Sequence, residues 1–519
     1  MKLTKSKYVQ FMMCKRKAWL DLYDHMDSDE SERAKEGKLV GEVAHKLLGD
    51  AIIIEQGELN PPTAAGLYAE YPLIYNDLLC LVDLLKINND GSIDIYEVKS
   101  STNWLNTSTA KEGIPLDKYF HDISFQYYVA TKLNKTVNTV NLVTLNKEYI
   151  YDGVNLDLNQ LFLINDYKHL LINNIDEVES NVKEYFNLDI NKEIKCKFSS
   201  FCNANDGCLY LQKCKDYHNL TGKLDLYNIF KSSTNKYINK NITNINELYN
   251  DIKEYNDLNN FMKMVIDYNV NNIDKPYVNK KELKEFLNKL EYPLYFFDFE
   301  STQIYVPQFK NSRPIQQIPF QYSLHIMNSK DDTFEQVVKN HEEYLGDGVT
   351  DPRIELVNRM IKDLSTKGSI IAYFDGFERK IIESLVADFP LYKNELLNIK
   401  NRFVDLRKPF NSRVDKFKDP VTSKNVEETR ITVYQKDMGK RSSIKVVLPA
   451  FFPNNPEYNY SNLKQIHNGQ EASSAYKKLS DLPKEEKEEL RENMLKYCCL
   501  DTKAMVALYF KLKELSENK

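Results

Sequence analysis

Acidic side chains in the C-terminal half of this 519-residue chain have spacings suited to metal chemistry. Asp298 and Glu300 end the apolar segment YPLYFFDFES and lie two residues apart, so on a strand they share one face. Tyr497 and Asp501 lie four residues apart and share one face of a predicted helix. Glu378 falls in the first turn of a helix that follows the apolar segment GSIIAYF. Because Mg²⁺ and Mn²⁺ prefer oxygen ligands, these acids are candidate metal ligands.

A second set of charged residues surrounds a predicted β-hairpin in LLCLVDLLKINNDGSIDIYEVKSS. Asn-Asp-Gly is a strong turn signal, and a turn centred near Asp90 places Asp83 directly opposite Glu97. Lys99 lies on the same face as Glu97. Two facing carboxylates in an apolar hairpin are destabilising, and a divalent cation between them removes that penalty. Since Lys99 can hold a water or a phosphate oxygen, the set predicts metal-assisted phosphodiester hydrolysis.

The composition excludes several classes of protein. Hydrophobic residues make up 42% and charged residues 28%, which is typical of globular domains and excludes collagen-like or wholly disordered chains. The net charge of −5 argues against a uniformly basic nucleic-acid coat protein but leaves room for a local basic groove. No apolar run reaches the ~18 residues of a membrane span, and the N-terminus lacks the apolar core of a signal peptide. We therefore expect a cytoplasmic protein without a membrane partner.

Half of the eight cysteines occur in one short segment, with five residues between neighbours: Cys196, Cys202, Cys208 and Cys214. Because disulfides are improbable in a cytoplasmic protein, such a cluster indicates metal binding. Thiolates suit either zinc or an iron–sulfur cluster. Zinc ribbons usually carry closely spaced CxxC pairs, and this sequence has none, which favours the iron–sulfur cluster.

The elements that must position these residues follow from hydrophobic periodicity. Helices are predicted near 35–48 and 120–133, and strands within 68–99 and 139–151. Residues 221–285 are rich in Asn, Lys and Tyr but retain recurrent apolar positions, which indicates a helical connector. A strand-rich unit begins at Pro293 and ends in a long helix near 484–516. We expect a multidomain α/β protein divided into residues 1–220, 221–285 and 286–519.

The first 220 residues resemble the PD-(D/E)XK nuclease superfamily, and within it the RecB-like, CRISPR-associated-type members that carry an iron–sulfur cluster. The resemblance rests on the hairpin aspartate, EVKSS, FQYYV and GEVAH. It implies a restriction-endonuclease-like core in which Asp83, Glu97 and Lys99 are catalytic, with Gln126 beside them. It also implies that His45 joins Asp83 and Glu97 in binding the metal.

The same resemblance implies a ligand set for the cofactor. One cysteine precedes the nuclease core in these families and three follow it. The matching residues here would bind a 4Fe–4S cluster, with zinc as the alternative: Cys14, Cys202, Cys208 and Cys214. Cys196 would then be a spare or alternate ligand.

The C-terminal segment resembles the DEDD (DnaQ-like) exonucleases of the RNase H-like fold, in the variant that carries a tyrosine. The residues that match are DFE, an acid in a helix after a strand, and YCCLD. The resemblance implies that four acids bind two Mg²⁺ or Mn²⁺ ions and that one tyrosine orients the attacking water: Asp298, Glu300, Glu378, Asp501 and Tyr497. Asp375, which follows Phe374, is an alternative ligand to Glu378.

The whole layout resembles a bacterial family of unknown function that joins these two nuclease types. We expect a nuclease with two active sites that hydrolyses DNA, preferring single strands or ends, in DNA repair or defence against foreign DNA. An RNA exonuclease is one alternative, and a nucleic-acid-binding scaffold with one inactive module is another. The best candidate for phosphate contacts is the basic loop with Lys436, Lys440, Arg441 and Lys445.

Overall fold

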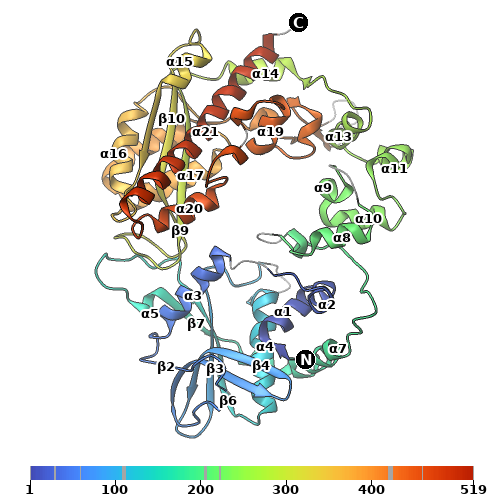
Figure 1. Cartoon of the computed structure of the whole chain (residues 1–519), viewed down its shortest axis with the longest axis vertical. Coiled ribbons are helices and arrows are strands. Elements are labelled where there is room, and N and C mark those ends of the chain that lie inside the picture. The colour runs from blue at the N-terminus through green and yellow to red at the C-terminus, as the bar shows by residue number, and fades with distance from the viewer. Residues whose placement is uncertain are drawn as a thin grey trace. The chain divides into compact units, whose positions relative to one another are not determined.

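The computed structural model describes residues 2–27, 31–58, 60–107, 113–203, 207–220, 224–418, 425–458 and 460–517. The chain forms two compact units (Figure 1). The first comprises Met1–His218 and Ile304–Gln316, and the second comprises Asn219–Gln303 and Gln317–Lys519. Residues 221–285, which we expected to form a connector, are therefore part of the second unit. Both units mix helices and strands, which agrees with the expected multidomain α/β class.

The first unit is built on a seven-stranded sheet in the order β2-β3-β4-β5-β6-β7, with β1 paired to β4. The pairs β3–β4, β4–β5 and β6–β7 are antiparallel, whereas β1–β4, β2–β3 and β5–β6 are parallel. The strands are β1 (Leu3–Thr4), β2 (Ile52–Ile53), β3 (Gly66–Tyr75), β4 (Leu78–Ile87), β5 (Ile93–Lys99), β6 (Val137–Leu145) and β7 (Phe162–Asp166).

Helices cover both faces of this sheet. Alternation along β6 places Val140 and Leu142 in a core with α1 and α4, and Val143 and Leu145 in a separate core with α3. The helices are α1 (Lys5–Met13), α2 (Lys15–Tyr23), α3 (Glu32–Ala44), α4 (Asp117–Lys132), α5 (Leu158–Leu161), α6 (Lys168–Leu171), α7 (Ile175–Phe186) and α8 (Leu211–Tyr217). The helix expected near 120–133 is thus confirmed as α4.

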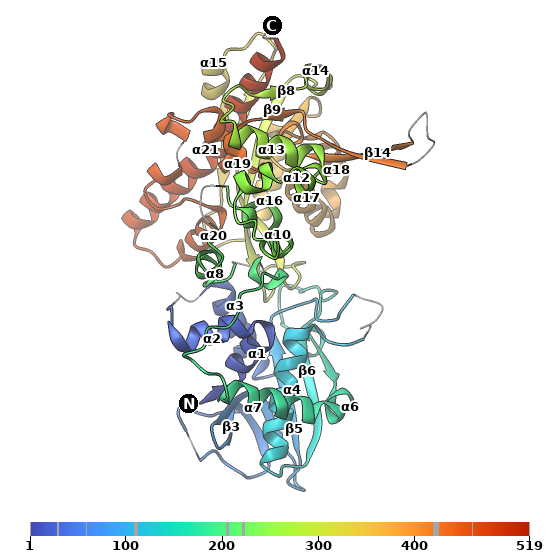
Figure 2. The same ribbon diagram turned by 90° about the vertical axis from the view of Figure 1, so that its right-hand side faces the viewer.

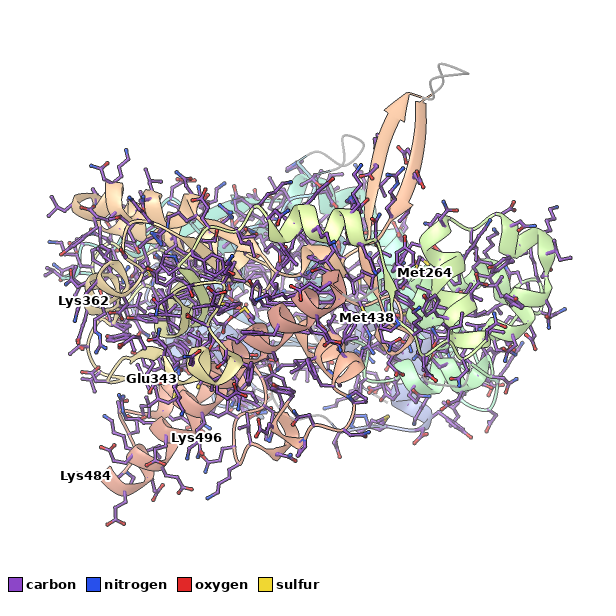
Figure 3. All side chains as sticks on the ribbon, turned by 90° about the horizontal axis from the view of Figure 1, so that it is seen from above. Met264, Glu343, Lys362, Met438, Lys484 and Lys496 are labelled. Carbon is purple, nitrogen blue, oxygen red and sulfur yellow. The ribbon has the colours of Figure 1, made fainter. Side chains whose placement is uncertain are left out.

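The second unit contains a five-stranded sheet in the order β11-β10-β9-β12-β13. Strands β10 and β11 are antiparallel, whereas β12 runs parallel to both β9 and β13. The strands of this unit are β8 (Tyr277–Val278), β9 (Leu294–Ile304), β10 (Gln316–Met327), β11 (His341–Leu345), β12 (Ser369–Ala372), β13 (Phe403–Asp405), β14 (Arg413–Lys418), β15 (Asn425–Arg430) and β16 (Val433–Tyr434). The antiparallel hairpin β14–β15 projects from its unit (Figures 2 and 3).

Alternation along β9 divides the second unit into two cores. Tyr295 and Phe297 pack with α16, α17 and α18, whereas Leu294 and Phe296 pack with α19, α20 and α21 on the opposite face. The helices are α9 (Leu226–Phe230), α10 (Thr234–Ile238), α11 (Ile245–Asn250), α12 (Ile252–Asn256), α13 (Asn260–Val270), α14 (Lys280–Leu287), α15 (Phe334–Lys339), α16 (Arg353–Asp363), α17 (Gly376–Asp388), α18 (Lys393–Asn401), α19 (Ile444–Phe451), α20 (Gly469–Lys478) and α21 (Lys484–Glu517).

The long C-terminal helix was expected near 484–516 and is present as α21. Its exposed side carries charged residues such as Lys484 and Lys496, labelled in Figure 3. Its other side packs on the sheet with Met494, Leu508 and Leu512 in the core. Among the described residues, no helix combines the length and the apolar character that crossing a bilayer demands.

Candidate active sites and thiol cluster

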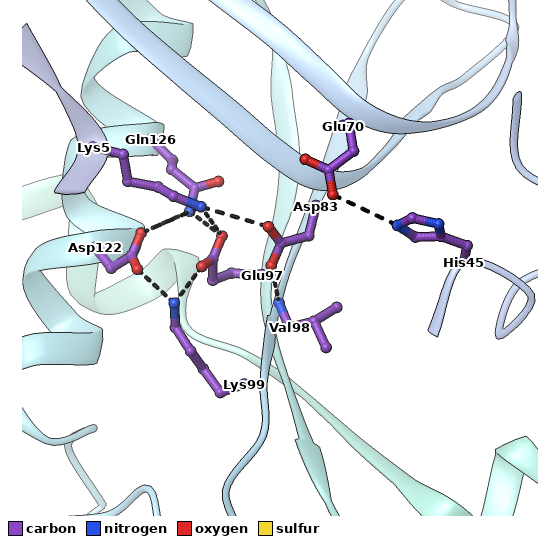
Figure 4. Close-up of polar contacts among 9 residues, drawn as sticks. All are labelled: Lys5, His45, Glu70, Asp83, Glu97, Val98, Lys99, Asp122 and Gln126. Carbon is purple, nitrogen blue, oxygen red and sulfur yellow. Dashed lines mark hydrogen bonds and ion pairs between the residues drawn. The ribbon is translucent and has the colours of Figure 1, made fainter. Parts of the chain in front are cut away.

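Asp83, Glu97 and Lys99 lie together at the end of the β4–β5 ladder (Figure 4). The ladder pairs Leu84 with Tyr96, and one further step in this register places Asp83 beside Glu97, as the sequence predicted. Asp83 Oδ2 accepts a 2.7 Å hydrogen bond from the backbone N–H of residue 98. The Lys99 ammonium donates to Glu97 Oε1. The hairpin therefore gathers two carboxylates and one cation on a single face.

Helix α4 adds two residues to this group, one helical turn apart. Gln126 Nε2 donates to Glu97 Oε2 at 2.6 Å and to Asp122 Oδ1 at 3.0 Å. Lys99 Nζ donates to Asp122 Oδ2 at 2.6 Å. The structure thus brings Gln126, which the resemblance named as a site residue, into contact with Glu97. Sequence reasoning missed Asp122, although its position four residues before Gln126 puts it on the same helix face.

Lys5 is a further member that the sequence did not indicate. Its Nζ lies 2.8 Å from Glu97 Oε2, 3.6 Å from Asp83 Oδ1 and 3.9 Å from Asp122 Oδ1. The short strand β1 pairs with β4, and the side chain of Thr4 caps the start of α1, which directs Lys5 between the carboxylates (Figure 4). No motif marks this lysine. We call Lys5, Asp83, Glu97, Lys99, Asp122 and Gln126 the N-terminal site.

Burial and mutual charge control protonation in the N-terminal site. Burial, followed by the charges of Asp122 and Asp83, raises the pKa of Glu97 to about 7. Burial opposes the charged form of Lys99, but Asp122 and Glu97 outweigh it and raise the lysine pKa. Burial likewise opposes ionisation of Asp122, yet Lys99 and Lys5 bring its pKa well below the usual value. The site therefore holds interacting charges with one carboxyl poised near neutrality.

A cleft of about 1070 Å³ opens onto the N-terminal site and is also lined by His45 and Glu70. His45 caps the C-terminus of α3, and its buried Nε2 makes no hydrogen bond. This nitrogen lies 3.7 Å from Glu70 Oε1. Burial, followed by the charge of Asp83, raises the pKa of Glu70. The structure thus places His45 in the same cleft as Asp83 and Glu97, with its Nε2 facing the Glu70 carboxylate.

Asp298 and Glu300 lie on the face of β9 that α21 covers. Because β12 runs parallel to β9 and pairs Ile371 with Phe296, the chain leaving β12 arrives beside Asp298. That chain enters α17, whose first turn contains Glu378. Side chains at the carboxyl ends of adjacent parallel strands are a common way to build a site. We call Asp298, Glu300, Glu378, Tyr497 and Asp501 the C-terminal site.

Helix α21 contributes Tyr497 and Asp501, which are one turn apart and both buried. Tyr460 donates a 2.5 Å hydrogen bond to Asp501 Oδ1, and its ring centroid lies 6.1 Å from that of Tyr497. Lys445, from the start of α19, lies 3.5 Å from the Tyr497 hydroxyl and over both rings. Tyr460 was not foreseen, because it lies in a short 3₁₀ helix outside any recognisable motif.

The structure distinguishes the two acids considered near the start of α17. Asp375 forms an ion pair of 2.7 Å with Arg379. Glu378 is 3% exposed, and its Oε2 is buried without a hydrogen bond. The charge of Glu378 also contributes to the raised pKa values of Asp298 and Glu300. Glu378 is therefore the acid that the fold brings to the C-terminal site.

Burial raises the pKa of every acid in the C-terminal site. Burial is the first cause at each residue, and neighbouring carboxylates add to it at Asp298, Glu300 and Glu378. The pKa values of Glu300 and Glu378 reach about 8, and that of Asp501 reaches about 6. Cys498 also approaches, with its Sγ 4.0 Å from Asp298 Oδ2. Such a group is suited to binding a cation, which would favour the ionised carboxylates.

The expected basic loop is largely committed to contacts within its unit. Lys436 pairs with Asp274, and the Lys440 ammonium donates to the backbone oxygen of Ile229 at 3.0 Å. Burial lowers the pKa of Lys440. The Lys445 ammonium lies beside the Tyr497 hydroxyl of the C-terminal site. The structure therefore does not present these lysines as one continuous exposed patch.

The thiols from both ends of the first unit converge. Cys14 lies between α1 and α2, and the charges of Cys202 and Cys214, after burial, raise its pKa. The same two cysteines, again after burial, raise the pKa of Cys208. A hydrogen bond from Cys196, together with Arg16, lowers the pKa of Cys214 to about 7 against the effect of burial. The four cysteines named for the cluster thus lie near one another, with Cys196 beside them.

Comparison with known proteins finds similarity to proteins of unknown function. Residues 295–443 match the family model described as a domain of unknown function, DUF2779. The chain is also similar to the Uncharacterized protein MG366 of Mycoplasma genitalium, with 23% identity over 490 residues. That alignment covers 86% of this chain and 69% of the relative. Both findings support the expectation of a bacterial family of unknown function.

Proposed function

We propose that this protein is a metal-dependent nuclease with two active sites that hydrolyses phosphodiester bonds of DNA. The observation that carries the proposal is the group of four carboxyl side chains from β9, α17 and α21, three of them buried, which lies beside Tyr497. Burial raises the pKa values of these acids, and neighbouring carboxylates raise those of Asp298 and Glu300 further, so their charged forms are costly to bury unless a cation binds them. The proposal includes an RNase H-like fold for the second unit and a PD-(D/E)XK-like fold for the first unit.

The C-terminal site fits Mg²⁺ or Mn²⁺. The donor set is all oxygen, and Glu378 presents a buried carboxylate oxygen without a partner. A Cβ at Gly469 would lie only 3.3 Å from Glu300 Oε2, so this glycine leaves room at the carboxylate. Asp298, Glu300, Glu378 and Asp501 would hold the ions. Once bound, the ions would polarise the phosphate and favour ionised water.

The other residues of the C-terminal site have roles that follow from their contacts. Tyr460 holds Asp501 in place by its hydrogen bond. The Tyr497 hydroxyl faces the acids and can orient the attacking water. Lys445, held by a 2.7 Å hydrogen bond to the backbone oxygen of His467, places a positive charge over the two tyrosine rings. That charge can stabilise the developing negative charge on a phosphate.

The N-terminal site fits one divalent cation held by Asp83 and Glu97, with His45 as a third ligand across the cleft. The observation in its favour is the buried His45 Nε2, which has no hydrogen bond although it lines the same cleft. Gln126 fixes the orientation of Glu97. Lys99 can hold a phosphate oxygen or the attacking water. The bound cation would supply Lewis acidity at the phosphate.

The thiol group fits a 4Fe–4S cluster on Cys14, Cys202, Cys208 and Cys214. The cysteines are free thiols, and a thiolate at Cys214 is favoured by its hydrogen bond and by Arg16. Four thiolates also suit a tetrahedral zinc ion, which is the alternative. When bound, the cluster would tie α2 to α8.

The proposal is tested with end-labelled single-stranded DNA and RNA in the presence of Mg²⁺ or Mn²⁺. Lys99→Ala and Asp298→Ala should each remove part of the DNA cleavage, since each disables one site. Lys86→Ala on β4 and Asp331→Ala change exposed residues outside both sites and serve as controls. Cleavage of RNA alone would favour the RNA exonuclease. Binding without cleavage under either metal would favour the nucleic-acid-binding scaffold.

A further inference from the structure

A cluster of two histidines and one cysteine lies in the second unit, outside the carboxylate group. His325 and His341 face each other across the antiparallel pair β10–β11, and their ring centroids are 4.5 Å apart. Cys499 approaches from α21. One ligand atom from each of these residues lies within 4.8 Å of the others. His325 is 1% exposed, whereas His341 and Cys499 are half-buried, so the cluster can be reached from solvent.

Neighbouring hydroxyl groups hold the two imidazoles in defined orientations. Thr502 Oγ1 lies 2.9 Å from His325 Nδ1, and Ser323 Oγ lies 2.8 Å from His341 Nε2. The two hydroxyls are 2.8 Å from each other. Each imidazole therefore has one nitrogen at hydrogen-bond distance from a hydroxyl group. Partners of this kind fix the orientation of metal-binding histidines.

The geometry points to a Zn²⁺ site formed by one imidazole nitrogen each from His325 and His341 and by Cys499 Sγ. Zinc is borderline-soft and is bound by imidazole and thiolate, whereas Mg²⁺ and Mn²⁺ prefer oxygen. Zn–N bonds of ~2.0–2.1 Å and a Zn–S bond of ~2.3 Å place tetrahedral ligands about 3.4–3.7 Å apart, so only small adjustments of the present arrangement are needed. Three protein ligands leave the fourth position to water. On binding, the Cys499 thiol loses its proton to solvent.

The position of this zinc site gives it a function separate from the carboxylates. Cys499 directly follows Cys498, but Cys498 approaches Asp298 whereas Cys499 approaches the histidines. A zinc ion would therefore fasten α21 to the β10–β11 edge of the sheet. The same helix carries Tyr497 and Asp501. The ion would thus brace the helix on which the C-terminal site depends, without taking part in hydrolysis.

The test measures Zn²⁺ binding to the full-length protein in excess Mg²⁺, which occupies the oxygen sites. Competition with a chromophoric chelator should show that the native protein binds one Zn²⁺ more than His341→Ala or Cys499→Ser. His467→Ala removes a histidine that contacts Glu471 and should retain the native number. The thiols of the first unit are present in every variant, so the difference reports only on the proposed site. Equal zinc content in all variants would overturn the proposal.

Cobalt provides a spectroscopic readout that does not depend on counting. The native protein loaded with Co²⁺ should show thiolate-to-cobalt absorption that is partly lost in Cys499→Ser. Cys499→His keeps a zinc ligand at this position, so it should retain the extra Zn²⁺ while losing that absorption. If Cys499→His retains the extra Zn²⁺, the loss of zinc in Cys499→Ser is not a result of misfolding. An unchanged cobalt spectrum in Cys499→Ser would contradict the site.

Discussion

The Lys5 ammonium lies 2.8 Å from the Glu97 carboxylate, joining the start of the chain to the centre of the N-terminal site. It also approaches Asp83 and Asp122, so it neutralises acids that the fold has already brought together. A divalent cation would perform the same neutralisation. Lys5 and the metal are therefore expected to compensate for each other electrostatically.

The first prediction follows from this compensation. Lys5→Met should destabilise the metal-free protein by about 3 kcal/mol, because breaking a buried ion pair leaves uncompensated charge. Mn²⁺ should restore most of that loss by binding the carboxylates that no longer have Lys5 as a partner. Thermal unfolding with and without Mn²⁺ measures both effects, with the exposed Lys86→Met as the matched control. A loss of stability that Mn²⁺ leaves unchanged would contradict metal binding by Asp83 and Glu97.

Gln126 tests how far the N-terminal site depends on the orientation of its acids. Gln126→Ala removes the hydrogen bonds to Glu97 and Asp122, and residues that orient metal ligands typically contribute ~10–100-fold in affinity or activity. We expect that loss in DNA cleavage when the assay is run in an Asp298→Ala background, which leaves only the N-terminal site active. Full activity in this background would argue that Glu97 needs no such support.

Tyr497 tests the water-orienting role in the C-terminal site. Tyr497→Phe removes only the hydroxyl that faces Asp501 and Lys445. In a Lys99→Ala background, kcat should fall by about 100-fold with little change in KM, since misplacing a reacting group costs this much. Steady-state kinetics on end-labelled DNA separates the two constants. A change confined to KM would assign the tyrosine to substrate binding instead.

The raised pKa values of Glu300 and Glu378 predict how stability depends on pH in the metal-free protein. The folded state keeps protons up to about pH 8, whereas the unfolded chain releases them near the ordinary glutamate value. The folded state therefore binds more protons, and stability falls as pH rises from about 4.5 to about 8. Glu378→Gln should gain roughly 4 kcal/mol at pH 8 and almost nothing at pH 4.5.

Unfolding curves at several pH values, recorded with a chelator, measure this effect. Adding Mg²⁺ should flatten the pH dependence of the native protein, because bound ions favour the ionised carboxylates. The exposed Asp331→Asn provides a control with no buried acid removed. If the metal-free native protein and Glu378→Gln showed the same change in stability between pH 5 and pH 8, the buried acids would not be protonated as described.

The proposed iron–sulfur cluster predicts different outcomes for substitutions of Cys14 and Cys196. Anaerobically purified protein should show the visible absorption of an iron–sulfur cluster. Cys14→Ser should lose it because one of four ligands is removed, whereas Cys196→Ser should retain it because Cys196 is the spare thiol. Cys80→Ser changes a buried thiol on β4 and should also retain it. A colourless native protein with stoichiometric zinc would replace the cluster with the zinc alternative.

Much of the N-terminal site was predictable because its spacing is local. The Asn-Asp-Gly turn fixes the register of β4 and β5, and that register alone places Asp83 beside Glu97. Gln126 was found by resemblance, and Asp122 was missed although it lies one turn away on α4. Lys5 could not be found from the sequence, because its position depends on the pairing of β1 with the start of β4. The backbone hydrogen bond beside this pairing joins Leu3 to Asp77, which are 74 residues apart in the sequence.

The C-terminal site shows the same limit. Asp298 with Glu300 and Tyr497 with Asp501 were readable because each pair lies within one strand or one helix. Choosing Glu378 over Asp375 required the structure, since only the fold shows which acid pairs with Arg379. The His325–His341 pair depends on the register of β10 with β11, which no turn motif in the sequence reveals.

Cleavage of end-labelled single-stranded DNA by Lys99→Ala, Asp298→Ala and the double variant tests the central claim most directly. The account predicts that each single variant retains part of the native Mn²⁺-dependent cleavage and that the double variant loses at least ~100-fold. Lys86→Ala/Asp331→Ala, the matched control, should cut at the native rate. Native cleavage by the double variant Lys99→Ala/Asp298→Ala would contradict the assignment of both sites.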